Sequence, residues 1–119
     1  MAKVLVVDDD PEIRATIQTY LGADYHVLTA KDGQEGLEVF LRESPQVVIA
    51  DIKMPRMNGI ELAKKIRATS GDVAIVILTG YVETDYVIEA IRFEASDFLS
   101  KPLDIERLRQ AIEHGLKKT

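Results

Sequence analysis

Short runs of apolar residues alternate with amphipathic segments along the whole chain, and this alternation limits the fold more than any other feature. Continuous runs of Val, Ile and Leu are typical of strands buried on both faces of a parallel sheet. Strict alternation of strand and helix gives right-handed crossovers and a doubly wound sheet. We therefore predict an α/β fold with a five-stranded parallel sheet and helices on both of its faces. The expected strands are residues 3–8, 25–30, 47–51, 74–79 and 97–100.

Polar residues that cap helices precede each amphipathic segment. Asp10 stands directly before a proline, which is favoured at the first helical position, and Asp32 precedes a glutamate by three residues. Apolar residues then recur at helical spacing, and we expect Tyr20 in the first helix and Leu41 in the second to face the core. The expected N-caps are Asp10, Asp32, Asn58, Thr84 and Asp104.

Length and composition exclude several classes of protein. The chain has 119 residues, 46% of them apolar, so we expect residues 1–119 to form a single domain. A net charge of −5 without a cluster of Lys and Arg argues against direct contact with nucleic acid or membrane. The longest apolar run, residues 73–78, is far too short to span a bilayer. The chain has no cysteine, so disulfides and thiolate metal sites are excluded, which favours a cytoplasmic protein. His26 and His114 lack the paired spacing of metal ligands.

Residues suited to handling a phosphoryl group stand at the ends of four expected strands. Asp8 and Asp9 close the first strand, Asp51 closes the third, Thr79 closes the fourth, and Lys101 follows the fifth. Open α/β sheets bind ligands beyond the carboxyl ends of their strands, so we expect one crevice to hold these side chains. Adjacent carboxylates repel one another at low dielectric unless a cation lies between them, and hard oxygen ligands suit Mg²⁺.

Plainer interpretations exist for each of these residues alone. The acids after the first strand could be a polar end to that strand, and Asp10 is better explained as a helix cap. Lys101 alone would be a surface lysine, and Thr79 alone a strand-end hydroxyl. Their joint placement at strand ends favours a phosphoryl site over the plainer interpretations. A turn residue also follows each of Thr79 and Lys101, namely Gly80 and Pro102.

Three sequence segments at these strand ends resemble the receiver domain of two-component response regulators. They are VVDDDP at residues 6–11, DIKMPRMNG at 51–59 and ASDFLSKP at 95–102, and the resemblance covers the whole chain. It implies a flavodoxin-like doubly wound (βα)5 fold with strand order 2-1-3-4-5. It also implies phosphorelay signalling, with a sensor histidine kinase or a histidine phosphotransfer protein as the phosphoryl donor.

The resemblance also implies a role for each acidic residue. Asp51 would be the phosphoacceptor and, together with Asp9, a side-chain ligand of Mg²⁺, with Mn²⁺ as an alternative ion. Asp8 would be a ligand through water, and Lys53 a ligand through its backbone carbonyl. A carboxylate that attacks phosphorus needs its charge neutralised and cations on the equatorial oxygens, which the metal and Lys101 would supply.

The remaining implied roles concern the switch. Thr79 and Lys101 would contact the phosphoryl oxygens, Phe98 would change rotamer on activation, and the Lys101–Pro102 bond would be cis. The surface of the fourth helix, fifth strand and fifth helix would then be read by an output domain or target protein, or by a second copy in a phosphorylation-linked homodimer. The domain would catalyse its own phosphorylation and dephosphorylation, yet act as a signalling switch and not as an enzyme.

The chain departs from the family pattern at a few positions. Glu94 stands where relatives commonly have the glycine that ends the fourth helix in a left-handed conformation, so strain or a different helix end is expected. Phe98 replaces a tyrosine seen in many relatives, so no phenol is available for a switch hydrogen bond. Lys53 and Tyr81 flank the site at positions that vary in the family.

Three alternatives belong to other functional classes. A Mg²⁺-dependent aspartyl phosphatase also places an Asp after a buried strand, but its general acid would stand two residues later, where this chain has Lys53. An FMN binder needs a phosphate loop rich in Ser, Thr and Gly after the first strand, where the three acids would repel phosphate. A pseudo-receiver that acts only as a protein-interaction module would not need the complete set of acids, Thr79 and Lys101.

Overall fold

The computed structural model describes residues 1–80 and 84–117, and within them strands and helices alternate without exception. No helix of these residues is long and apolar enough to cross a membrane. The strands are β1 (Lys3–Val7), β2 (His26–Ala30), β3 (Val47–Ala50), β4 (Ala74–Thr79) and β5 (Asp97–Ser100). The helices are α1 (Pro11–Leu21), α2 (Gly33–Glu43), α3 (Gly59–Thr69), α4 (Thr84–Arg92) and α5 (Ile105–Lys117).

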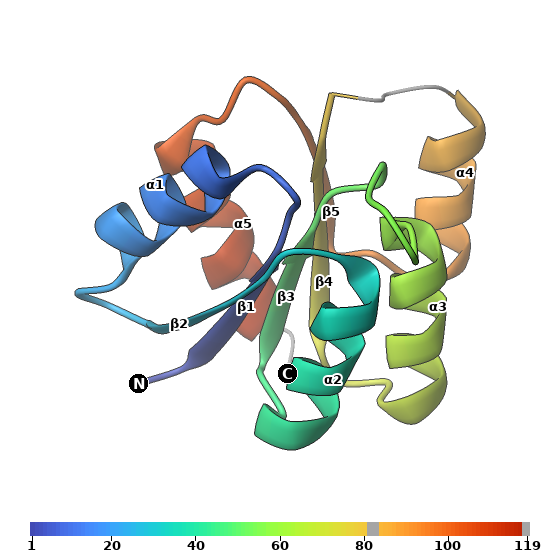
Figure 1. Cartoon of the computed structure of the whole chain (residues 1–119), viewed down its shortest axis with the longest axis horizontal. Helices are drawn as coiled ribbons and strands as arrows, with labels where there is room; N and C mark the ends of the chain where they lie inside the picture. The colour runs from blue at the N-terminus through green and yellow to red at the C-terminus, as the bar shows by residue number, and fades with distance from the viewer. Residues whose placement is uncertain (81–83, 118–119) are drawn as a thin grey trace.

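All strand pairs are parallel, and the order across the sheet is β2-β1-β3-β4-β5, as predicted. Helices α1 and α5 cover one face of the sheet, while α2, α3 and α4 cover the other (Figure 1). Val7 pairs with Ala30 on one side and with Ala50 on the other, so β1, β2 and β3 end level with one another. This register brings the segments that follow β1 and β3 to one edge of the sheet.

Successive strand residues point to opposite sides of the sheet. Because helices cover both sides, the sheet is buried on both faces. One face packs under α2, α3 and α4, and the other packs under α1 and α5. The buried strand residues toward α2–α4 include Leu5, Val7, Val48, Ala50, Ile75 and Ile77. Those toward α1 and α5 include Val4, Val6, Val47, Ile49, Val76 and Leu78. Strands covered on both faces explain why the sequence shows continuous apolar runs and not a clean alternation.

Capping side chains set the starts of four helices. The Asp10 carboxylate accepts a hydrogen bond from the Glu12 N–H at 2.9 Å, and Asn58 forms a reciprocal capping box with Glu61. Asp32 and Asp104 likewise accept from N–H groups of α2 and α5. These four predicted caps are confirmed. Helix α4 already includes Thr84, whose side chain lies outside the described atoms, and Tyr81 lies outside the described residues.

Two predicted core positions are wrong. Tyr20 and Leu41 are each 58% exposed, because they lie at the margin of their helices' apolar stripes, where the neighbouring layer no longer covers them. The stripes themselves are confirmed by buried residues of each helix, such as Ile17 in α1 and Phe40 in α2. The second strand also begins one residue later than predicted, at His26.

Candidate functional site

The ends of β1 and β3 bring three carboxylates together. The Asp8 N–H donates to the Ala30 carbonyl at 3.1 Å and the Asp51 N–H to the Val7 carbonyl at 3.0 Å, so each acid extends the strand ladder by one residue. One carboxylate oxygen from each of Asp8, Asp9 and Asp51 lies within 4.8 Å of the other two. Asp8 and Asp51 are 2% and 6% exposed, whereas Asp9 faces solvent. This set of hard oxygen donors, open on one side, fits a hydrated divalent cation such as Mg²⁺.

Lys101 brings a positive charge into the same cluster. Its ammonium Nζ lies 3.0 Å from Oδ2 of Asp51 and 3.1 Å from Oδ2 of Asp8. The Lys101 N–H donates to the Thr79 carbonyl at 2.8 Å, which fixes the segment after β5 beside the end of β4. The Lys101–Pro102 bond is cis, as the resemblance implied. The structure therefore brings together the lysine and the acids that the sequence analysis placed at one sheet edge.

Burial and hydrogen bonding oppose each other in setting the pKa values of Asp8 and Lys101. Desolvation raises the pKa of Asp8, and the opposing hydrogen bonds from the Asp10 N–H and the Lys101 ammonium do not cancel this effect. For Lys101, desolvation alone lowers the pKa, but the hydrogen bonds to Asp51 and Asp8 raise it overall. Lys101 is thus held as a cation. The cluster holds three carboxylates and the Lys101 ammonium contacts two of them, Asp8 and Asp51, so the surplus negative charge favours a further cation.

Backbone contacts orient the Asp51 side chain. Its Oδ1 accepts from the Ile52 N–H at 2.7 Å, while its Oδ2 accepts from Lys101. The loop after Asp51 folds back closely enough that the Gly59 N–H donates to the Ile52 carbonyl at 2.8 Å. A Cβ atom on Gly59 would lie 2.0 Å from the Asp51 carbonyl oxygen, so only glycine permits this approach. The end of β3 positions Asp51, and Gly59 lets the loop pack against the Asp51 backbone.

The two predicted switch residues lie on adjacent strands. Thr79 is fully buried at the end of β4, and it pairs with Ser100 on β5. Phe98 is partly buried on β5, and its ring packs against the core cluster under α2–α4. The structure thus places Thr79 beside the backbone of Lys101, and Phe98 against the core cluster that also contains Ala90 of α4.

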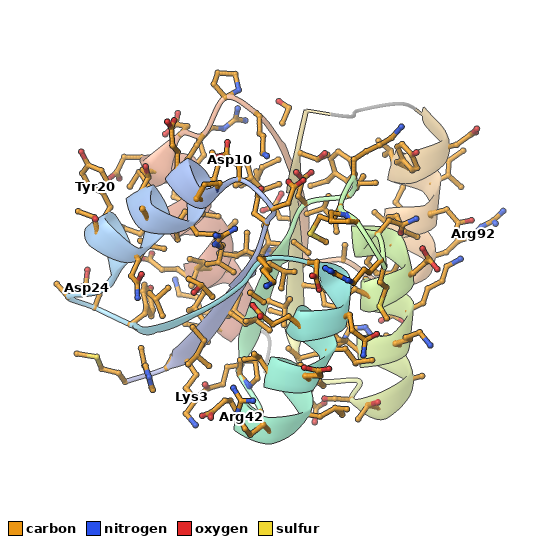
Figure 2. The ribbon with its side chains drawn as sticks, viewed as in Figure 1. Lys3, Asp10, Tyr20, Asp24, Arg42 and Arg92 are labelled. Carbon is orange, nitrogen blue, oxygen red and sulfur yellow. The ribbon has the colours of Figure 1, made fainter. Side chains whose placement is uncertain are left out.

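One neighbour of the acids escaped the sequence analysis. Arg14 donates from Nη1 to the Asp8 carbonyl oxygen at 2.7 Å. The available signal was its position one turn into a helix that begins beside the acids, because such a side chain points back toward the helix start. Figure 2 shows Asp10 at this start of α1, next to the edge where β1 ends.

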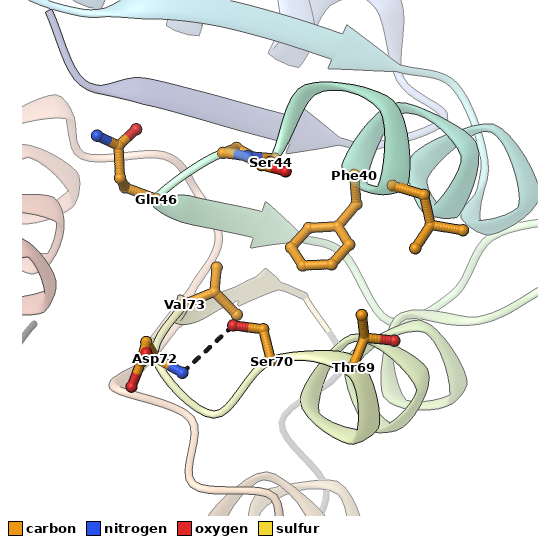
Figure 3. A pocket seen from close by; sticks show the side chains of 9 residues that line it. Phe40, Ser44, Gln46, Thr69, Ser70, Asp72 and Val73 are labelled. Carbon is orange, nitrogen blue, oxygen red and sulfur yellow. Dashed lines mark hydrogen bonds between the residues drawn. The ribbon is translucent and has the colours of Figure 1, made fainter.

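Two cavities differ in their relation to the acids. A hollow of about 350 Å³ opens beside Asp9 and Lys53 and is also lined by Tyr86 of α4, so ligands can reach the acidic cluster there. A second hollow, of about 390 Å³, lies between the C-terminal ends of α2 and α3, where Phe40 and Val73 line it (Figure 3). None of the predicted site residues lines the second hollow. The first hollow therefore marks the candidate site.

Comparisons with known proteins agree with this arrangement. The response regulator receiver domain family matches residues 4–113. The probable transcriptional regulator ycf27 of Guillardia theta is 39% identical over 118 residues, covering 98% of this chain and 46% of that protein. Sporulation initiation phosphotransferase F of Bacillus subtilis is 31% identical over 115 residues, covering 96% of this chain and 93% of that protein.

A solved structure shows the same likeness in three dimensions. The response regulator TrrA from Thermotoga maritima, crystallised in complex with Mg²⁺–BeF, matches with a TM-score of 0.87 and 31% identity, covering 97% of this chain and 99% of that chain. The chain spans about half the length of several curated relatives it matches. The family match, the relatives and the shared strand order agree, and the chain belongs to the receiver domain family of two-component response regulators.

Proposed function

We propose that this receiver domain accepts a phosphoryl group on Asp51 from a histidine kinase or a histidine phosphotransfer protein in the cytoplasm. The proposal is carried by the environment of Asp51, which is 6% exposed, lies in a cluster of acids and contacts the Lys101 ammonium at 3.0 Å. A carboxylate with a purely structural role would need only the lysine as a partner and no neighbouring acids. The surplus of negative charge at an open sheet edge suits a site that recruits a cation and then a phosphoryl group.

Each residue has a defined part in the proposed reaction. An oxygen of Asp51 forms a bond to phosphorus, the bond from phosphorus to the donor's histidine nitrogen breaks, and the imidazole leaves with the electron pair. Lys101 stabilises charge on the phosphoryl oxygens. Asp9, Asp51 and the Lys53 carbonyl would hold Mg²⁺ directly and Asp8 would hold it through water, with Mn²⁺ as an alternative. The bound ion would supply charge neutralisation at the phosphoryl oxygens.

The proposed output begins at Thr79 and Phe98. The acyl phosphate adds negative charge next to the end of β4, and Thr79 can hydrogen-bond to it if the end of this strand moves inward. Phe98 on the neighbouring strand has a suitable size to fill the space that this movement leaves. The α4–β5–α5 surface, where Ile88 and Ile91 are already 43% and 70% exposed, would then be read by an output domain, a target protein or a second copy.

Labelling with radioactive acetyl phosphate tests the acceptor. We expect label on the wild type that requires Mg²⁺ and is removed by hydroxylamine, because carboxylate attack produces an acyl phosphate. Asp51→Asn should take up none. Equal labelling of Asp51→Asn would refute the assignment of the acceptor, and no labelling of the wild type by acetyl phosphate or by a phosphorylated kinase would favour a protein-interaction module.

A further inference from the structure

The loop between β3 and α3, residues 51–58, lies at the same edge as the acidic cluster and contains Lys53 (Figure 1). Two backbone features show that the loop has one defined path. Arg56 has a φ of 69°, in the left-handed region that non-glycine residues rarely occupy, and the Met57 N–H donates to the Pro55 carbonyl at 2.8 Å. A non-glycine residue stays in this conformation only where its surroundings hold it there.

An ion pair ties this loop to a distant part of the chain. The Arg56 guanidinium Nη1 lies 2.6 Å from Oδ2 of Asp32, at the start of α2. Asp32 is 2% exposed, and its other oxygen accepts from the Glu35 N–H at 2.8 Å. Both carboxylate oxygens are therefore engaged, one by the helix and one by the loop. The Arg56 side chain is 64% exposed, so solvent weakens the charged hydrogen bond, but the Asp32 side chain that it reaches is only 3% exposed.

The backbone is packed tightly at the same place. A Cβ atom on Gly33, the residue after Asp32, would lie 2.1 Å from the carbonyl oxygen of Met57, the residue after Arg56. Met57 itself is 8% exposed and packs in the core cluster under α2–α4. The N-terminus of α2 thus packs against the loop backbone and binds the loop through the Asp32–Arg56 ion pair. The hydrogen bond from the Gly59 N–H to the Ile52 carbonyl joins the two ends of the loop.

We propose that Asp32 and Arg56 are positioning residues for the phosphorylation site. By fixing the loop against α2, the pair presents the backbone carbonyl of Lys53 to the cluster of Asp8, Asp9 and Asp51. This inference rests on the proposed Mg²⁺-dependent function, and it adds a residue pair that touches neither the acids nor the phosphoryl group. Loss of the pair is expected to weaken Mg²⁺ binding while the fold persists.

Two substitutions remove the pair with little other change. Asp32→Asn removes the charge but keeps a side chain that caps helices as well as Asp does. Arg56→Gly removes the guanidinium and suits the left-handed backbone conformation at this position. Arg56→Lys keeps a positive charge without the planar guanidinium, so it tests whether charge alone suffices. Asp24→Asn is the control, since it breaks an Asp–Arg pair of the same 2.6 Å length, in which Asp24 is 60% exposed and Arg109 lies on α5, on the other face of the sheet (Figure 1).

Mg²⁺ titration followed by amide NMR shifts of the loop and the acids provides the readout. We expect about 10-fold weaker Mg²⁺ affinity in Asp32→Asn and in Arg56→Gly, the lower end of effects seen when residues that orient metal ligands are removed. The double variant should lose no more than either single variant, because each already breaks the pair. Arg56→Lys should recover part of the affinity, and Asp24→Asn should match the wild type. The Mg²⁺ concentration for half-maximal labelling by acetyl phosphate should rise in parallel, with the rate at saturating Mg²⁺ preserved.

The outcomes separate this inference from the proposed function. Wild-type Mg²⁺ affinity in Asp32→Asn and Arg56→Gly, in a protein that does bind Mg²⁺ and label Asp51, would overturn the positioning role and leave the proposed function intact. A loss of unfolding free energy without any change in Mg²⁺ affinity would likewise overturn it, because it would show a purely structural pair. A wild type that neither binds Mg²⁺ nor labels Asp51 would refute the proposed function itself.

Discussion

Glu94→Gly should stabilise the fold, which is an unusual expectation for a substitution to glycine. Glu94 follows α4 with a φ of 60°, so the chain leaves the helix in the left-handed conformation that the sequence analysis expected for this position. The Glu94 side chain is exposed, and its carbonyl accepts from Arg67 Nη2 at 3.1 Å. That hydrogen bond involves the backbone and survives the substitution. The change therefore removes backbone strain without removing a contact.

Two opposing terms set the size of the effect. The left-handed conformation costs a non-glycine residue about 1–2 kcal/mol, which glycine avoids. Glycine in turn loses about 0.5–1 kcal/mol more conformational entropy on folding. The difference predicts a gain of about 0.5–1 kcal/mol in the free energy of unfolding. For a domain of this size, the melting temperature should rise by about 2–5 °C.

Urea denaturation followed by circular dichroism measures the change, with the slope of the transition checked for equality between variants. Ala68→Gly is the control, because Ala68 is an exposed residue in the last turn of α3, where glycine should lower stability by up to about 1 kcal/mol. A midpoint for Glu94→Gly that falls alongside the control would show that Glu94 is unstrained, and would refute the reasoning.

Three further predictions concern the site. Burial raises the pKa of Asp8, so the ionised side chain opposes folding near pH 7. Without metal, Asp8→Asn should therefore be more stable than the wild type near pH 7. Calorimetry should show that this gain is lost as the pH falls below the unfolded-state pKa of Asp. Gly59→Ala should cost at least about 2 kcal/mol in urea denaturation, since its Cβ would meet the Asp51 carbonyl. Thr79→Ala should still label at Asp51 but show much smaller beryllofluoride-induced NMR shifts across α4, β5 and α5; wild-type shifts would contradict the coupling.

The sheet and the acidic cluster were predictable because their signals are local. An apolar run ends where a strand ends, and the residue after it must lie at the sheet edge, so Asp51 and Asp8 followed from the pattern alone. Helix caps were equally accessible, because a side chain such as that of Asn58 bonds to N–H groups two or three residues away. The cis bond before Pro102 came from the family resemblance and not from the physics of the residues.

Features that depend on distant residues were beyond the sequence. Asp32 and Arg56 are separated by 24 positions, and nothing in either segment indicates that they pair. The exposure of Tyr20 and Leu41 depends on how far the neighbouring layer extends, which helical periodicity does not encode. Arg14 could be placed near the start of α1, but its hydrogen bond to the Asp8 carbonyl depends on how α1 packs on the sheet.

Identification of the modified residue tests the central claim most directly. The domain would be incubated with acetyl phosphate and Mg²⁺ and then reduced with borohydride, which converts an aspartyl phosphate to homoserine, before peptide mass spectrometry. We predict homoserine at position 51 and nowhere else, with none formed when Mg²⁺ is chelated. Homoserine at position 8 or 9, or equal conversion at position 51 without Mg²⁺, would contradict the account of the site.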